Sequence, residues 1–337
     1  MGGFKWEGSV TDQDYMTEGA EVNAIKQTAF SVEELGVQRS VKKVSKQLTL
    51  GGEPTPKAKP DPRNRLNNLT NREWIFFTRS TWFTSFPREI GFKLRNQHGG
   101  NKPPALMKHL IEFFTKRDEV VLDPMCGVGG TLLGASLAGR KAVGIEINGE
   151  WTKIYATVCK EAHITPQTTF NGDCIETMRK MRSSFDFIVV DPPYRENTFN
   201  PNVSGVRKQA FANGEKMTSL TESFSTDKRD FGNSESYENY MSRLTTMFKE
   251  CHRLLREGRY LVVFSKDEFR DGGFFELSSE IARCAAKVGF KWVGKITWVQ
   301  AGAPLRPYGL PFTYVPNFTD QKILVLKKGN GNGVGHT

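Results

Sequence analysis

Apolar and polar blocks alternate between residues 120 and 190 in a way that predicts strands separated by helices. Short, mainly apolar runs at 120–122, 141–146 and 187–190 have the length of buried strands, and the segment 132–139 has the length of a helix. Strands without a polar face are typical of parallel sheets that helices cover on both sides. This region therefore predicts an α/β fold with a doubly wound, mostly parallel sheet.

The pattern resumes after residue 233 with a second series of helices and strands. Amphipathic spacing predicts the helices, and unbroken apolar runs predict the strands. Together with the earlier elements they are enough for one α/β domain with decorations. The predicted elements are a helix at 237–257 that ends before Gly258, a strand at 260–264, a helix at about 274–288, and strands at 291–299 and 321–327.

Two segments before residue 96 lack a comparable pattern. Residues 1–65 are polar, with basic residues around several prolines, a composition that argues against a packed core. We expect a flexible basic arm here, either as a solvated tail or as a segment that follows phosphate groups. Residues 66–95 form an adaptor segment in which aromatic residues alternate with arginines. These side chains either pad the outside of the domain or stack on bases.

A long polar stretch at 195–233 interrupts the pattern inside the domain. It is rich in Asn, Ser, Thr, Gly, Lys and Arg, and it is long for an internal connection in a compact domain. It is predicted to be a substrate lid that orders on nucleic acid, with disordered filler as the alternative. Its candidate phosphate contacts are Arg207, Lys208, Lys216, Lys228 and Arg229.

Net charge and cysteine content narrow the classes of partner. The 337 residues carry a formal charge of +10, which suits a polyanion such as nucleic acid. No stretch approaches the ~20 apolar residues of a membrane span, and the polar N-terminus lacks the pattern of a signal peptide. The five cysteines form no Cys-x-x-Cys pair, which argues against a disulfide framework and a zinc site. We expect a reduced, cytoplasmic protein without a membrane or metal partner.

A glycine-rich turn follows the first predicted strand. Gly127, Gly129 and Gly130 lie between a strand and a helix, where small residues let a ligand approach the backbone and the helix N-terminus. The spacing Gly-x-Gly-Gly differs from the dinucleotide fingerprint, so a nucleoside without a pyrophosphate is favoured. Glu146, at the end of the second strand, has the spacing to hydrogen-bond a ribose. Asp173, after a third strand, can accept a hydrogen bond from an adenine amino group.

A second motif, Asp191-Pro192-Pro193-Tyr194, follows the buried run 187–190. An amino group conjugated to a base ring is a poor nucleophile, because its lone pair is delocalised into the ring. Asp191 and the Pro192 carbonyl group can each accept one N–H, which leaves the lone pair free to attack. The prolines stiffen the turn, and Tyr194 offers a flat face for a base. The alternative is an ordinary turn at the end of a strand.

Together these motifs resemble those of S-adenosylmethionine-dependent amino methyltransferases, the family that modifies adenine N6 or cytosine N4 in DNA. The resemblance covers about residues 95–328 and includes the segment 98–111, which is similar to the family motif that closes over the methionine end of the cofactor. It departs from the family pattern at Met125, where Phe is usual, and at Gly130, where Ser or Thr is common. The cofactor-binding residues that it implies are Lys102, Asp123, Pro124, Met125, Cys126, Gly127, Gly129, Thr131, Glu146, Ile147, Asp173 and Cys174.

The resemblance also implies a fold and a reaction. The fold is a class I methyltransferase domain at 96–328, whose seven-stranded sheet ends in an antiparallel C-terminal hairpin, followed by a disordered tail at 329–337. The cofactor is S-adenosyl-L-methionine, and its methyl group passes directly to the amino nitrogen of a base that is flipped out or single-stranded, without a metal. The catalytic residues that the resemblance implies are Asp191, Pro192, Pro193 and Tyr194.

The motifs determine the substrate and the partners less closely. Asp at the first position of the catalytic turn is commoner in adenine-type members, so DNA adenine N6 is expected over cytosine N4. The motifs are also compatible with an RNA base-amino methyltransferase and with a non-catalytic subunit that only binds nucleic acid or a partner. Because no large insertion is present to read a sequence, we expect a short recognition sequence, loose specificity, or a partner subunit or dimer.

The loop between the last two strands carries further candidates. Residues 304–314 combine prolines with aromatic residues, so this loop either walls the pocket for an extruded base or packs as an ordinary loop. Its candidate nucleic-acid contacts are Arg306 and Tyr308, with Phe312 as an alternative stacking partner.

Overall fold

The computed structural model describes residues 59–86, 90–193, 225–270, 272–300, 303, 305 and 307–329. Most of the predicted arm at 1–65 and of the predicted lid at 195–233, and the predicted tail after Gly329, lie outside the described residues. The strands are β1 (Thr81–Trp82), β2 (Val120–Asp123), β3 (Lys141–Glu146), β4 (Thr168–Asn171), β5 (Phe185–Val190), β6 (Leu255–Ser265), β7 (Glu268–Arg270), β8 (Gly273–Phe275), β9 (Phe290–Val299) and β10 (Asp320–Lys328). The helices are α3 (Asn71–Phe77), α4 (Phe92–Arg95), α5 (Pro104–Phe114), α6 (Gly130–Ala138), α7 (Gly149–Glu161), α8 (Cys174–Lys180), α10 (Tyr237–Leu254) and α11 (Leu277–Lys287), with short 3-10 turns η2 (Asn96–His98) and η3 (Phe231–Asn233).

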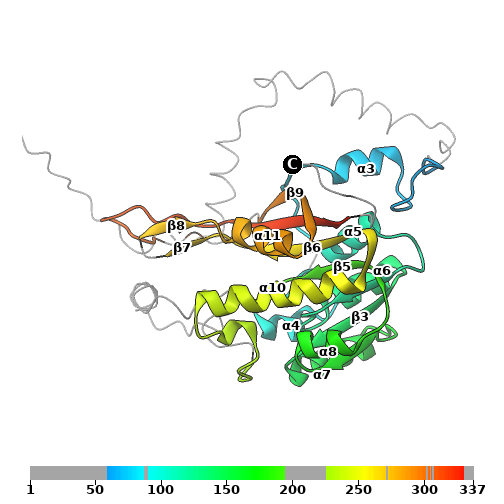
Figure 1. The fold of residues 1–337 in the computed structure, drawn as a ribbon, viewed down its shortest axis with the longest axis horizontal. Helices are drawn as coiled ribbons and strands as arrows, with labels where there is room; N and C mark the ends of the chain where they lie inside the picture. Colours follow the sequence, from blue (N-terminus) through cyan, green and yellow to red (C-terminus); the bar gives the residue numbers. More distant parts are fainter. Residues whose placement is uncertain are drawn as a thin grey trace, which may run out of the picture. The chain divides into compact units, whose positions relative to one another are not determined.

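Most of the strands join one sheet in the order β1-β9-β10-β6-β5-β2-β3-β4 (Figure 1). From β6 to β4 in this order all neighbours pair in parallel. β10 runs antiparallel to both of its neighbours, β6 and β9, and β7 and β8 form a separate antiparallel hairpin. The doubly wound, mostly parallel sheet and the antiparallel C-terminal hairpin that the sequence predicts are confirmed.

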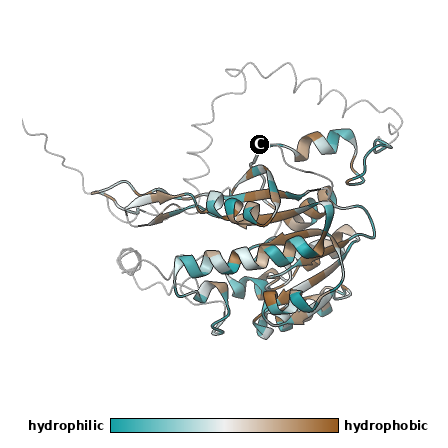
Figure 2. Ribbon diagram, in the orientation of Figure 1, coloured by the Kyte–Doolittle hydropathy of each residue, from teal (hydrophilic) through white to brown (hydrophobic). Residues whose placement is uncertain are grey.

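Helices cover both faces of the sheet because consecutive strand residues point to opposite sides. In β2, Val121 packs in a buried cluster with residues of α5, α6 and α7, whereas Leu122 packs in a second cluster with residues of α8, α10 and α11. Every residue of β5, in the middle of the sheet, is buried. Figure 2 shows hydrophobic strands beside helices such as α10, whose visible side is largely hydrophilic. The core therefore consists of two apolar layers, one on each face.

The described sheet has eight strands, one more than the seven that the sequence predicts. The additional strand is β1, which pairs in parallel with Thr297 and Trp298 of β9. The Thr297 amide donates to the Ser80 carbonyl group at 2.8 Å, and the Trp298 indole N–H donates to the Thr84 carbonyl group at 3.0 Å. Two residues are too few to produce a hydrophobic period, so the sequence pattern does not reveal this strand.

Helix α10 ends at Leu254, three residues before the predicted end. β6 begins at once with Leu255, which pairs with Phe185 of β5. The Lys328 ammonium group also donates to the Leu255 carbonyl group at 2.8 Å. Pairing with the sheet thus replaces the last helical turn that the local pattern predicts.

The aromatic segment before the domain has a buried part and an exposed part. Phe77, the last residue of α3, stacks on Phe113 of α5 with ring centroids 3.6 Å apart, and Trp82 of β1 meets the Phe77 ring edge-on. Phe76 and Phe83 are 49% and 75% exposed. This segment therefore contributes to the core and also presents aromatic surface.

Candidate active site

The predicted catalytic turn begins where β5 leaves the sheet. Asp191 follows the last buried residue of β5, and 22% of its side chain is exposed. The Lys102 ammonium group, from the segment before α5, forms an ion pair with Asp191 and lies 5.0 Å from the centroid of the Phe264 ring. The structure thus brings together a predicted catalytic carboxylate and a predicted cofactor residue that are 89 positions apart in the sequence. Tyr194 lies outside the described residues.

Asp123, the last residue of β2, holds the glycine-rich turn from the inside. Its carboxylate accepts a hydrogen bond from the Met125 amide at 2.9 Å and another from the Thr131 hydroxyl group. Burial raises the pKa of Asp123 to about 7. These hydrogen bonds join the end of β2 to the start of α6. Asp123 and Thr131 therefore shape the turn, which begins with Pro124.

Two glycines of the turn have backbone conformations that other residues rarely adopt. The φ angles are 49° at Gly127 and 76° at Gly129. A Cβ atom at position 129 would overlap the ring of Tyr155, and one at position 127 would lie 3.0 Å from the His98 imidazole. Cys126 is buried beside them. The turn therefore requires glycine for its backbone conformation and for its close packing.

Gly130, where the sequence departs from the family pattern, has a structural reason to lack a side chain. A Cβ atom there would lie 2.6 Å from the Lys102 carbonyl oxygen and 3.3 Å from the Arg95 Nη2 atom. The backbone of Lys102 thus packs directly on the first residue of α6. Ser or Thr at this position would displace Lys102 from the site.

Glu146, the last residue of β3, faces the turn from the neighbouring strand. Its Oε2 atom accepts a hydrogen bond from the Gly127 amide at 2.8 Å, and its Oε1 atom accepts one from the Asn148 amide at 2.9 Å. Burial raises the pKa of Glu146 to about 7. The carbonyl group of the next residue, Ile147, accepts from the Asn171 side chain at 3.2 Å. Each carboxylate oxygen of Glu146 keeps a second lone pair with which it can accept from a ribose hydroxyl group.

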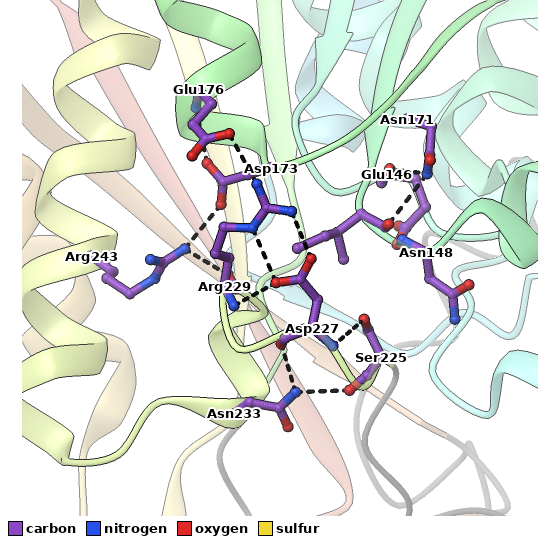
Figure 3. A network of polar contacts seen from close by, with 11 residues as sticks. Glu146, Asn148, Asn171, Asp173, Glu176, Ser225, Asp227, Arg229, Asn233 and Arg243 are labelled. Atoms are coloured by element: carbon purple, nitrogen blue, oxygen red, sulfur yellow. Dashed lines mark hydrogen bonds and ion pairs between the residues drawn. The ribbon is translucent and has the colours of Figure 1, made fainter.

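Asp173 has partners that the sequence reasoning missed. Its Oδ1 atom caps α8 by accepting from the Glu176 amide at 2.9 Å, and its Oδ2 atom pairs with Arg243 of α10 at 3.0 Å (Figure 3). Cys174, the first residue of α8, is buried. The spacing Asp-x-x-Glu is a signature of helix N-termini and could have revealed the cap. Nothing in the sequence indicates the pairing with Arg243.

A network of polar contacts continues from Asp173 to the end of the predicted lid (Figure 3). The Nη2 atom of Arg243 also donates to the Arg229 carbonyl group at 2.6 Å. The Arg229 guanidinium group in turn pairs with Asp227 and with Glu176 of α8. The proposed phosphate contact Arg229 therefore already has two carboxylate partners within the protein.

Residues 225–233 bring the chain back to the catalytic turn. The Asn233 side-chain amide donates to two carbonyl groups of this segment, at 2.7 and 2.9 Å. A Cβ atom on Gly232 would lie 3.6 Å from the Cβ atom of Pro193. Pro192, beside it in the turn, is buried. The segment therefore connects α8 and α10 with the catalytic turn.

Lys102, Asp191 and the glycine turn line a single pocket. His98 is also part of the wall, and burial lowers its pKa to about 4, so its imidazole group is neutral at pH 7. The sequence does not mark two further wall residues, Val189 and Phe264, because core strand residues all look alike in the pattern.

The remaining loop candidates do not reach this pocket. Lys228 and Arg229 are exposed, and Tyr308 is half-buried. Phe312 is 93% exposed. Within the described part of the chain, none of these four lines the pocket. Four further candidates, Arg207, Lys208, Lys216 and Arg306, lie outside the described residues.

The described ranges contain neither a candidate metal site nor a candidate membrane span. Within the described ranges, no three His, Cys, Asp or Glu side chains are grouped so that they could hold a metal ion. The same part of the chain contains no helix with the length and apolar character needed to cross a membrane. All five cysteines are buried thiols.

The sequence matches a known family over most of its length. A family model described as DNA methylase (N6_N4_Mtase) matches residues 34–157 and 185–329. The chain belongs to this DNA methylase family. The matched residues include Gly127, Glu146 and Asp191, whereas Asp173 falls between the two matched stretches.

Curated relatives align with this chain over shorter stretches. The type II methyltransferase M.HindIII of Haemophilus influenzae is 44% identical over 54 residues, which are 16% of this chain and 18% of that protein. The DNA adenine methyltransferase YhdJ of Escherichia coli is 42% identical over 57 residues, 17% and 19% of the two proteins. A tRNA (guanine(10)-N2)-dimethyltransferase of Methanothermobacter thermautotrophicus is 32% identical over 98 residues, 28% of each protein. The chain therefore spans less than a third of the length of these relatives.

Solved structures similar to this chain include one that is described as a methyltransferase. The structure of TrmN from Thermus thermophilus has a TM-score of 0.44 and 14% identity, over 73% of this chain and 55% of that chain. A methyltransferase from Pyrococcus furiosus has a TM-score of 0.40 and 15% identity, over 67% of this chain and 83% of that chain. The family together with the sheet order identifies the class I methyltransferase fold that the sequence predicts.

S-adenosyl-L-methionine is the methyl donor of this DNA methylase family, and the prediction of this cofactor is confirmed. The residues of the turn fit it, because Gly127, Gly130 and Thr131 line the pocket, and the turn leads into the N-terminus of α6, which begins at Gly130. Glu146 is a buried acid that would accept hydrogen bonds from the ribose hydroxyl groups. Lys102 and the glycine turn would hold the methionine half in the pocket beside Asp191.

Proposed function

We propose that this protein transfers a methyl group from S-adenosylmethionine to the N6 amino group of adenine in DNA. The observation that carries the proposal is the position of Asp191 at the carboxyl end of β5, where it is ion-paired with Lys102 and lines the pocket of the glycine turn. A turn rich in acceptors beside a cofactor pocket suits a reaction at an amino group. Membership of the DNA methylase family supports DNA as the substrate.

The catalytic turn acts on the amino group by removing its conjugation with the ring. Asp191 and the Pro192 carbonyl group accept its two hydrogens, so the lone pair points away from the ring. The cofactor supplies the activated methyl group when it is bound. Lys102 fixes the Asp191 carboxylate through a charge-assisted hydrogen bond. After transfer the nitrogen becomes acidic, and Asp191 accepts the proton and passes it to solvent.

The pocket lies within the protein, at the edge of the sheet where the parallel strands have their carboxyl ends. A base must therefore leave the duplex to reach Asp191. We assign Tyr194 as the face on which the base stacks, and the segment 195–233 as the lid that orders over it. The basic and aromatic residues that we assign to nucleic-acid contacts are Arg207, Lys208, Lys228, Arg229, Arg306 and Tyr308.

We favour adenine over cytosine N4 for two reasons. The first residue of the catalytic turn is Asp191, the residue type that is commoner in adenine-type members of the family. The aligned relative YhdJ is a DNA adenine methyltransferase by name. Cytosine N4 in DNA is the alternative within the same family.

Methylation of a base amino group in RNA is a second candidate function. One observation favours it, namely the 32% identity over 98 residues with a tRNA (guanine(10)-N2)-dimethyltransferase. The same turn chemistry applies to a guanine N2 amino group. RNA is placed second because the family model describes a DNA methylase.

Transfer of a labelled methyl group to unmethylated DNA, followed by digestion to nucleosides, tests the proposal. We expect N6-methyldeoxyadenosine with the native protein and roughly a hundredfold less with Asp191→Asn, because the amide has one acceptor oxygen and cannot hold the proton. Asp320→Asn is the matched control. Asp320 also pairs with a lysine, Lys322, and is 23% exposed, but it lies in β10 and does not line the pocket. Its yield should stay within about twofold of native.

Each different product points to a different substrate. Detection of N4-methyldeoxycytidine would mean that the methylated base is cytosine and not adenine. A product on transcribed RNA but not on DNA would favour the second candidate. Cofactor binding without any product would favour a requirement for a partner subunit. A native yield from Asp191→Asn would contradict the assignment of the catalytic turn.

A further inference from the structure

Arg95, the last residue of α4, carries a charge that its described neighbours do not neutralise. Its side chain is 0% exposed, and its Nη2 atom donates to the Lys102 carbonyl group at 2.6 Å. Its Nε atom has no hydrogen-bond partner, and no carboxylate among the described residues pairs with the guanidinium group. Burial lowers the pKa of Arg95 to about 10, so the group is still a cation at neutral pH.

A second buried arginine, Arg140, shows the contrast with an arginine that only supports the fold. Arg140 is 8% exposed, and it donates to the hydroxyl and carbonyl groups of Thr115 and to the Ala138 carbonyl group. Arg95 has a single acceptor among the described residues, where Arg140 has three. Because a buried cation with so few partners is unfavourable, stability alone does not account for Arg95.

The guanidinium group of Arg95 lies directly behind the wall of the cofactor pocket. A Cβ atom on Gly130 would be 3.3 Å from its Nη2 atom and 2.6 Å from the Lys102 carbonyl oxygen. Gly130, Lys102 and Thr131 all line the pocket. Gly130 is also the first residue of α6, whose N-terminal amides carry partial positive charge. Two sources of positive charge therefore meet at the same part of the wall.

The charged side chains that line the pocket supply no positive charge beyond a lysine that is already ion-paired, so the charge of Arg95 can affect a ligand. Lys102 is already paired with Asp191, and Asp123 is an acid buried in the same wall. A ligand that brings a further carboxylate into this pocket therefore meets two acids and one lysine that is already paired. An additional positive charge is needed to favour such a ligand.

We propose that Arg95 is a positioning residue whose buried charge favours the carboxylate of the methionine half of S-adenosylmethionine. Arg95 does not line the pocket itself. It holds the Lys102 backbone against the start of α6, and it places a cation behind Lys102 and Gly130. The proposal deepens the proposed function, since it rests on S-adenosylmethionine as the ligand of this pocket. It is independent of which base receives the methyl group.

Equilibrium binding of S-adenosylmethionine and of decarboxylated S-adenosylmethionine to the full chain tests this role, because the two ligands differ only in the carboxylate. Arg95→Gln keeps a donor for the Lys102 carbonyl group and removes the charge. We expect it to weaken binding of S-adenosylmethionine about tenfold and binding of the decarboxylated ligand less than about twofold. Arg95→Lys keeps the charge and should retain most of the preference of the native protein for the carboxylate ligand. Arg140→Gln is the matched control and should preserve the ratio of the two affinities.

An equal loss of both ligands in Arg95→Gln would overturn the proposal and leave a purely structural role. Unchanged binding of S-adenosylmethionine in that variant would also overturn it. If Arg95→Gln does not fold, Arg95→Lys alone tests the proposal. Loss of the preference for the carboxylate ligand in this variant, which keeps the charge, would contradict the inference. Because the readout is binding, failure here is distinguishable from failure of the proposed reaction, which the nucleoside products report.

Discussion

Gly130 is the residue whose small size the pocket depends on most directly. A Cβ atom would meet a backbone oxygen, that of Lys102, which cannot turn aside as a side chain can. Gly130→Ala should therefore displace Lys102, lower the free energy of unfolding by about 1–3 kcal/mol, and weaken binding of S-adenosylhomocysteine in calorimetry. Gly294→Ala is the control, since its nearest neighbour, Val325, would be 4.0 Å away. Similar behaviour of the two variants would contradict the close packing of Lys102 on α6.

Glu146 makes the stability of the protein depend on pH. Burial raises its pKa from 4.5 to about 7, so the unfolded chain releases this proton near pH 4.5 whereas the folded protein keeps it until about pH 7. Since the folded state binds more protons in this window, the contribution of Glu146 to the free energy of unfolding falls as the pH rises.

Glu146→Gln cannot titrate and should lose this dependence. Between pH 4.5 and about 7, the free energy of unfolding of the variant should rise relative to that of the native protein by roughly 3 kcal/mol. Urea unfolding of both proteins across the window measures the difference. If the free energies of unfolding of the two proteins differ by the same amount at every pH in the window, the Glu146 carboxyl group titrates alike in the folded and unfolded states.

At the scale of the elements, β1 joins the aromatic segment to the sheet through Trp82. The Trp82 side chain is 6% exposed, its indole N–H donates to the Phe77 carbonyl group at 3.3 Å, and its ring centroid lies 5.2 Å from that of His109. Trp82→Ala should lower the free energy of unfolding by about 3–5 kcal/mol. Phe83→Ala, next to it but 75% exposed, should change it by less than about 0.5 kcal/mol. Equal effects in urea unfolding would mean that β1 is not part of the cooperative domain.

The interior elements could be predicted from the sequence more accurately than those at the edges. β5 is buried at every position, so its apolar run alone marks it as a strand. α11 begins at Leu277 and not near residue 274, because Gly273–Phe275 pair with Glu268–Arg270 in the β7–β8 hairpin. Short elements such as these exist because of their partners, and hydrophobic periodicity carries no information on a partner.

At the scale of the whole molecule, the site collects residues that are distant in the sequence. Gly127, Glu146 and Asp191 could be predicted as neighbours because each lies at or just after the end of a parallel strand. The carboxyl ends of parallel strands meet at one edge of a sheet. Arg95 and Arg243 could not, because both lie on helices and resemble ordinary surface arginines in the sequence. Their surroundings depend on how α4 and α10 pack, which no local pattern records.

The close approach of Gly232 to Pro193 also bears on how this protein can change in evolution. The chain leaves the sheet at the catalytic turn, and Gly232 comes close to the same turn before α10 begins. Doubling the length of such a segment costs only about 0.6 kcal/mol of closure entropy. If this segment is the lid that we propose, its replacement would change the substrate preference, while the ion pair of Lys102 with Asp191 would be inherited unchanged.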